Sequence, residues 1–124
     1  GNAIEAISFY QDAFQFTLCS EPKKHENQIV HVEMNLGDAM IMFAPEGAWG
    51  SDRKTPDHAK LPCPIGLYVY VPDVDKHFEH AKKQGAIVVD PPQDTFWGDR
   101  MSRLHDPFGY DWSFATLVRE LDLK

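Results

Sequence analysis

The order of predicted helices and strands repeats once along the chain, and this repetition restricts the possible folds most. The first part reads as a helix, a strand and a β-hairpin, and the last part as a strand, a helix, a strand and a second hairpin. The hairpin residues Gly37 and Gly109 stand 72 positions apart (109 − 37), and the helix residues Phe9 and Phe78 stand 69 apart (78 − 9). A nearly constant offset indicates a duplicated unit. The first copy lacks only an opening strand.

Hydrophobic periodicity places the individual elements of the first copy. We expect a helix from about Ala3, with Asn2 as its N-cap, because apolar residues then recur at helical spacing. Residues 29–36 alternate between apolar and polar side chains, as a half-buried strand does. Residues 21–28 are polar and contain Pro22, so we expect a loop there.

Composition limits the possible classes of protein and partner. A chain of 124 residues with 43% hydrophobic residues fits one domain with its own core. The formal net charge of −7 argues against nucleic acid and anionic lipid surfaces as partners. The apolar runs are too short to cross a bilayer. Cys19 and Cys63 show neither a redox motif nor zinc-ligand spacing, which fits a cytoplasmic protein.

These patterns predict one α+β domain over residues 1–124. We divide it into a first module at about 1–44, a linker at about 45–64, a second module at about 65–116 and a tail at 117–124.

Four segments then give the sequence a resemblance to a known family. They are residues 2–14, residues 31–38, the Trp-Gly-Asp-Arg run at 97–100 and the Asp-Pro-Phe-Gly turn within residues 106–112. In these segments the chain resembles the vicinal oxygen chelate superfamily, which contains glyoxalases, bleomycin-binding proteins and extradiol dioxygenases, and in particular its PhnB-like branch. The resemblance implies paired β-α-β-β-β modules that form a cup-shaped antiparallel or mixed sheet, and a homodimer. It also implies a strand ahead of Gly1 that this sequence lacks.

The resemblance also implies where a divalent metal would be bound, with one ligand from each of four strands. Three of the corresponding positions hold Met42, Gly66 and Ser113, which are poor ligands for such an ion. The fourth position would lie on the lacking strand. We therefore expect no metal at the usual place, although these residues do not exclude a divalent ion bound elsewhere.

Histidines offer two weaker candidate sites. His31 and Glu33 share one strand face and could act as an acid/base pair, or they could belong to a solvated polar face. His77 and His80 are three positions apart on a predicted helix, off its apolar stripe, and we expect them to be solvated.

The predicted ligand-binding residues are Trp97, Arg100, Tyr68, Met42 and Ser113. The guanidinium of Arg100 suits an anionic group and Trp97 offers a stacking surface, but a salt bridge would explain Arg100 equally well. We expect a small organic ligand bound in the cup without metal. The alternative is a metal-dependent lyase, isomerase or dioxygenase with relocated ligands, and whether the chain catalyses any reaction stays open.

Overall fold

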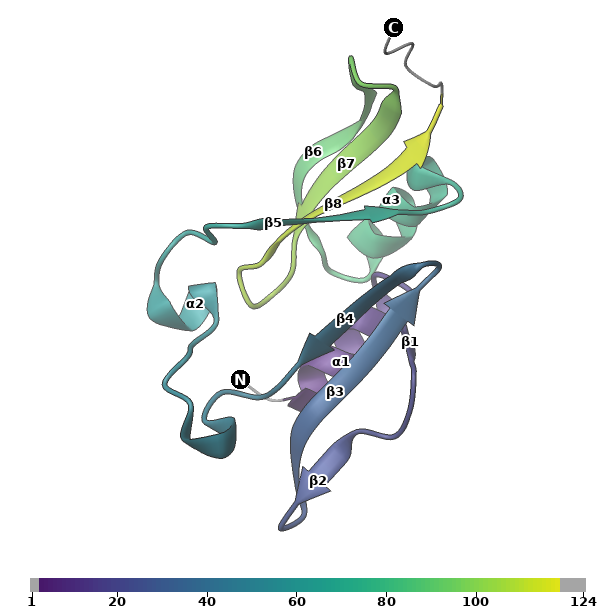
Figure 1. Ribbon diagram of the computed structural model, residues 1–124. Coiled ribbons are helices and arrows are strands. Elements are labelled where there is room, and N and C mark those ends of the chain that lie inside the picture. Colours follow the sequence, from purple (N-terminus) through teal and green to yellow (C-terminus); the bar gives the residue numbers. More distant parts are fainter. Residues whose placement is uncertain (1–2, 119–124) are drawn as a thin grey trace, which may run out of the picture.

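The computed structural model describes residues 3–118 and arranges them as two four-stranded sheets, each with one helix (Figure 1). The first part comprises α1 (Ala3–Asp12), β1 (Thr17–Leu18), β2 (Lys23–His25), β3 (Gln28–Leu36) and β4 (Ala39–Phe43). A linker follows with the short 3-10 helix η1 (Ala48–Gly50) and α2 (Pro56–Ala59). The second part comprises β5 (Gly66–Tyr70), α3 (Val74–Lys83), β6 (Ile87–Asp94), β7 (Asp99–His105) and β8 (Asp111–Leu117). The predicted cap Asn2 and residues 119–124 of the predicted tail lie outside the described range.

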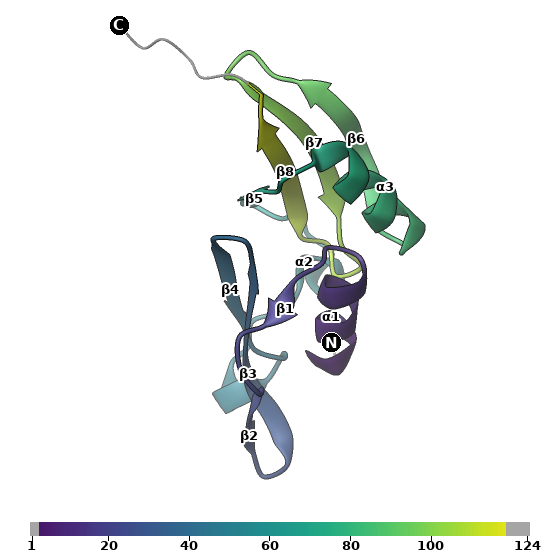
Figure 2. The ribbon, with the colours of Figure 1, turned by 90° about the vertical axis from the view of Figure 1, so that its right-hand side faces the viewer.

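The two parts are copies of one unit, as the sequence offset predicts. Both helices have ten residues and begin 71 positions apart (74 − 3), and each lies against its own sheet, on the same side in Figure 2. In the second sheet the strand order is β5-β8-β7-β6, with β5 parallel to β8. In the first sheet β1 and β2 pair with β3, and β3 pairs with β4, all antiparallel. The α+β class and the duplicated module are thus confirmed.

Strand alternation sorts side chains between the helix-covered face and the open face of each sheet. On β3, Val32 and Met34 are fully buried, whereas His31 and Glu33 between them are half-buried. Because side chains alternate along a strand, the whole polar set lies opposite the core. The buried side is built mainly from aromatic rings, including Trp112, which stacks parallel to another core ring.

One buried carboxylate joins the two modules. Asp106, which is 1% exposed, accepts hydrogen bonds from the Tyr10 hydroxyl at 2.7 Å and from Trp112 Nε1 at 2.9 Å. It also accepts from the backbone N–H groups of Phe108 and Tyr110. Burial raises the pKa of the Asp106 carboxyl, while these hydrogen bonds oppose the rise. The Asp-Pro-Phe-Gly turn is therefore fastened to α1 of the other module.

Two local predictions were wrong. Residues 21–28 contain β2, because Glu26 and Asn27 adopt positive φ angles and return the chain as a tight turn. The three residues of β2 are exposed, so they leave no apolar alternation in the sequence. His77 is 4% exposed, and its Nε2 lies 2.9 Å from the Phe14 carbonyl oxygen. His80 is half-buried, and its Nε2 lies 2.6 Å from the carbonyl oxygen of Asp12, the last residue of α1.

None of the helices within residues 3–118 is long and apolar enough to span a membrane.

Candidate functional site

The open face of the second sheet brings two of the predicted residues into direct register. Tyr68 on β5 pairs with Ser113 on β8, and Ser113 pairs with Arg103 on β7. Paired residues on neighbouring strands project to the same face of a sheet. The three side chains therefore form one row across the face that α3 does not cover.

A single buried carboxylate organises the aromatic residues of this face. Asp99 is 1% exposed, and its Oδ2 accepts hydrogen bonds from the hydroxyls of Tyr68 at 2.6 Å and Tyr70 at 2.8 Å. Trp97 Nε1 donates to the same oxygen at 3.2 Å and to the Tyr68 hydroxyl at 3.0 Å. Burial and the bond to Asp99 raise the pKa of Tyr68 to about 12, so its hydroxyl stays a donor at neutral pH.

The aromatic rings stay accessible although their polar ends are fixed. Tyr68 is 42% exposed, Tyr70 56% and Trp97 37%. The loop that carries Trp97 is closed by bonds between Thr95 and Asp99, in which the Thr95 hydroxyl and N–H reach the Asp99 carbonyl oxygen. Fixed aromatic rings with free surfaces are suited to stacking on a flat ligand.

Arg103 supplies the cationic group on this face, and the sequence analysis missed it. Its guanidinium contacts Asp111 at 3.0 Å and Asp90 at 3.5 Å, and its side chain is 37% exposed. Both ion pairs raise the pKa of Arg103, the Asp111 contact most strongly. Arg103 could have been predicted from its antiparallel pairing with Ser113, but that pairing is known only once the sheet is folded.

Arg100, the predicted cationic contact, lies on the opposite face of the same strand. It is three positions from Arg103, and its Nε lies 2.9 Å from Asp75 Oδ2 on α3, while its Nη1 lies 3.2 Å from Asp94. These hydrogen bonds raise the pKa of Arg100 and lower that of Asp75. The structure thus separates Arg100 from Trp97 and gives it the salt-bridge role that the sequence left open.

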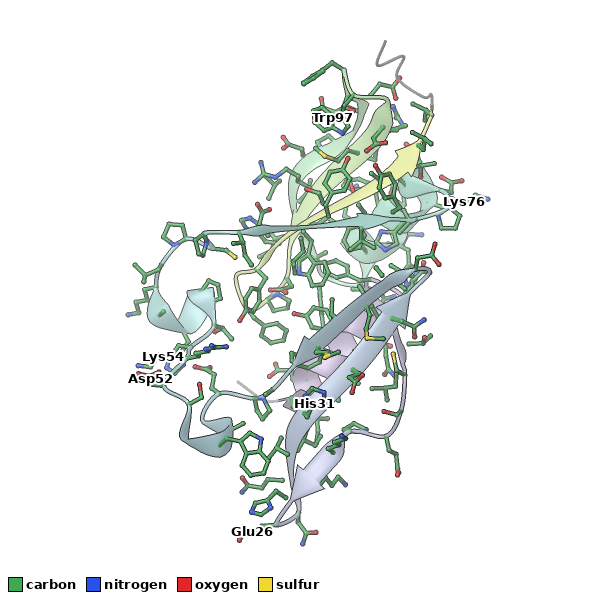
Figure 3. All side chains as sticks on the ribbon, viewed as in Figure 1. Glu26, His31, Asp52, Lys54, Lys76 and Trp97 are labelled. Carbon is green, nitrogen blue, oxygen red and sulfur yellow. The ribbon has the colours of Figure 1, made fainter. Side chains whose placement is uncertain are left out.

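The remaining predicted residues lie on the open face of the first sheet. Met42 on β4 pairs with Glu33 on β3 and is 61% exposed. His31 Nε2 lies 3.1 Å from Glu33 Oε2, so the predicted pair is in contact. Figure 3 shows His31 on β3 well away from Trp97, which lies near the far end of the second sheet. Met42 therefore belongs to a different surface from Trp97.

Comparison with known proteins identifies the family. Residues 1–114 match the family model described as the Glyoxalase/Bleomycin resistance protein/Dioxygenase superfamily. The chain belongs to this superfamily.

Other proteins resemble this chain in sequence or in fold. An uncharacterized protein of Mycobacterium bovis is 29% identical over 98% of this chain and 81% of its own length. The crystal structure of TioX from Micromonospora sp. ML1 superposes with a TM-score of 0.72 at 24% identity, covering 94% of this chain and 90% of TioX. TnmS3, an antibiotic binding protein from Streptomyces sp. CB03234, gives 0.68 at 19% identity over 94% and 88% of the two chains.

The superfamily's metal-binding pattern does not fit the residues described in this chain. Met42, Gly66 and Ser113 all lie on open sheet faces, by their strand registers, but a thioether, a glycine and a neutral hydroxyl are poor ligands for a hard divalent ion. Between residues 3 and 118, no three His, Cys, Asp or Glu side chains converge as a metal site would require.

Proposed function

We propose that this superfamily member binds a small organic molecule on the open face of its second sheet, without the metal of metal-dependent relatives. The observation that carries the proposal is the set of three accessible aromatic rings, Tyr68, Tyr70 and Trp97, whose polar ends share one carboxylate oxygen of Asp99. Such rings lose little freedom when they bind a ligand because their positions are already fixed. The ligand class is a molecule with an aromatic or extended apolar part.

An anionic end on the ligand is supported by Arg103 and Ser113, which adjoin Tyr68 in one row. A ligand anion would share the guanidinium with Asp111 and Asp90, or displace the longer contact to Asp90. Met42, the remaining predicted lining residue, lies on the open face of the first sheet and is therefore not part of the proposed ligand face. The resemblance in fold to an antibiotic binding protein is compatible with a sequestering role.

The wider predictions on assembly and location are proposals of the same kind. We propose a homodimer, which would cover exposed apolar side chains such as Met40, Met42 and Leu117. The free thiols of Cys19 and Cys63 fit a cytoplasmic location. The motifs at 97–100 and 106–109 support placement in the PhnB-like branch.

A second candidate function is acid/base catalysis by His31 and Glu33. The 3.1 Å contact between their side chains on an open sheet face favours it, because a carboxylate can orient an imidazole for proton transfer. A metal-dependent lyase, isomerase or dioxygenase would need metal ligands at positions other than the usual ones, such as His31 and Glu33. These two residues come from a single strand, whereas the family's usual ligands come from four.

The binding proposal is tested with anilinonaphthalene sulfonate, a fluorescent aromatic anion, titrated with and without a chelator. We expect saturable binding that the chelator does not change. Arg103→Gln should weaken the affinity by about tenfold or more, because a charge-assisted hydrogen bond is lost. Arg100→Gln is the matched control on the other face of β7, and it should leave the affinity unchanged. Equal effects of the two substitutions, or binding that requires added Mn²⁺, Ni²⁺ or Zn²⁺, would contradict the proposal.

A further inference from the structure

A second row of side chains borders Arg103 and Ser113 on the open face of the second sheet. In this row His105 on β7 pairs with Asp111 on β8, and Asp111 pairs with Gly66 on β5. The two rows are neighbours on one face, because alternate residues of a strand point to the same side of the sheet. His105 therefore lies beside the place that the proposed function gives to the ligand's anionic end.

One carboxylate connects the two basic side chains of β7. Asp111 Oδ2 lies 3.0 Å from Arg103 Nη2, and Asp111 Oδ1 lies 3.5 Å from His105 Nε2. The side chains of Arg103 and His105 are 37% and 39% exposed, whereas that of Asp111 is 22% exposed. A ligand can therefore reach both basic groups, while the carboxylate between them is mostly covered.

The charge of this surface depends on one proton. We call the four side chains of Asp90, Arg103, His105 and Asp111 the charged cluster; Asp90 Oδ2 lies 3.5 Å from Arg103 Nη1. With a neutral imidazole, two carboxylates face one guanidinium, so the formal charge of the cluster is −1 (−2 + 1). Protonation of His105 brings the formal charge to zero. It also gives the imidazole two N–H donors, one of which can contact Asp111 while the other is left for a ligand oxygen.

The elements around His105 add no further charged side chain to its row. On β6 its partner is Ile87, and on β5 the residue in this row is Gly66. In the turn after β7, Asp106 is buried in the core and Tyr110 packs against the core. The charged side chains that strand register and ion pairs place beside His105 are therefore those of the charged cluster.

We propose that His105 is the second cationic residue of the ligand site and binds the ligand's anionic end only in its protonated form. This inference rests on the proposed ligand site. Imidazoles ordinarily titrate near pH 6.5, so the affinity for an organic anion rises as the pH falls through that range. The favoured ligand end is a group with at least two acceptor oxygens, such as a carboxylate or sulfonate, because Arg103 and His105 can then be contacted together.

The test compares two fluorescent probes with the same aromatic framework. Anilinonaphthalene sulfonate keeps its negative charge in mild acid, and phenylnaphthylamine lacks the sulfonate. We expect the dissociation constant of the sulfonate probe to fall about tenfold between about pH 8 and about pH 5.5. The dissociation constant of the uncharged probe should change by less than about twofold, because the charged cluster acts on the anion alone. Circular dichroism at each pH verifies that the protein stays folded.

Three variants separate the charged cluster from other titrating groups. His105→Gln should remove the pH dependence and leave the affinity for the sulfonate probe at its weak, high-pH level. Asp111→Asn keeps the shape of the side chain and removes one negative charge, so it should strengthen binding at high pH. His58→Gln is the matched control, because His58 Nδ1 lies 2.7 Å from Glu46 in another imidazole–carboxylate pair, on the linker. This variant should keep the full pH dependence.

The outcomes distinguish this inference from the proposed function. Full pH dependence in His105→Gln, or pH-independent binding of the sulfonate probe to the unmodified protein, overturns the role of His105 and leaves the ligand site intact. Absence of saturable binding of both probes refutes the ligand site, and the inference with it.

If His105→Gln does not fold, nuclear magnetic resonance of the unmodified protein gives the answer. Because linkage is reciprocal, a tenfold effect of the proton on affinity requires that the bound probe shift the titration of His105. The ring resonances of His105 should then titrate about one pH unit higher with saturating sulfonate probe than without it. An unchanged titration overturns the inference.

Discussion

Replacing Asp106 with alanine tests whether this carboxylate fastens the two modules together. Asp106→Ala leaves two side-chain donors unpaired, the Tyr10 hydroxyl and Trp112 Nε1, whose side chains are 5% and 1% exposed. A buried donor without a partner costs about 1–3 kcal/mol. The two together give an expected loss of about 2–6 kcal/mol in the free energy of unfolding, before any loss from the backbone donors of Phe108 and Tyr110. The free energy of unfolding of a typical domain is about 5–15 kcal/mol, so the Asp106→Ala variant should be only marginally stable.

The measurement is urea unfolding followed by intrinsic fluorescence, arranged as a double-mutant cycle with Tyr10→Phe. Alone, Tyr10→Phe removes one hydrogen bond to Asp106 and should destabilise the protein. In the Asp106→Ala background the same change removes an unpaired hydroxyl, so it should be neutral or stabilising. Asp106→Asn keeps the shape and one acceptor oxygen and should cost less than Asp106→Ala. Additive effects of Tyr10→Phe and Asp106→Ala would refute the reasoning.

Two further predictions concern the turn and the buried histidine. Gly109 has φ +94°, and a Cβ at this position would stand 2.7 Å from the Asp57 backbone nitrogen. A Cβ at Gly37, which also has a positive φ, would meet nothing within 4 Å. Gly109→Ala should therefore lower the thermal unfolding midpoint more than Gly37→Ala does. Equal shifts would show that positive φ alone, at about 1–3 kcal/mol, sets the cost. Burial lowers the pKa of His77 below its ordinary 6.5, so the unfolded chain takes up a proton at a higher pH than the folded chain does. The free energy of unfolding should therefore fall by up to about 1.4 kcal/mol per pH unit as the pH drops below 6.5. His77→Gln should reduce this slope in urea titrations between about pH 5 and 7, and an unchanged slope would assign it to other groups.

Alternation and the internal offset predict most of the architecture because both reflect backbone geometry. The period of β3 identifies which side chains share a face, and the spacing of Gly37 and Gly109 predicts two equivalent hairpins. Alternation could not predict β2, because an exposed strand held by backbone hydrogen bonds has no apolar pattern in its sequence. The sequence pattern could not predict the burial of His77 either. A polar side chain can be buried where it forms a hydrogen bond with a distant part of the chain, here the Phe14 carbonyl oxygen.

The sequence by itself determined the class, the duplicated module and the set of residues from which a site could be built. Only the tertiary structure decided which of them meet. It placed Arg103 beside Ser113 and Tyr68 while turning Arg100 toward Asp75, although both arginines lie on one strand. The physical reason is that neighbours across a sheet come from strand register, and a shift of one residue moves a side chain to the opposite face. The hydrogen-bond partners of Asp99 come from β5 and from the loop before β7, and no local sequence pattern predicts that these two segments lie together.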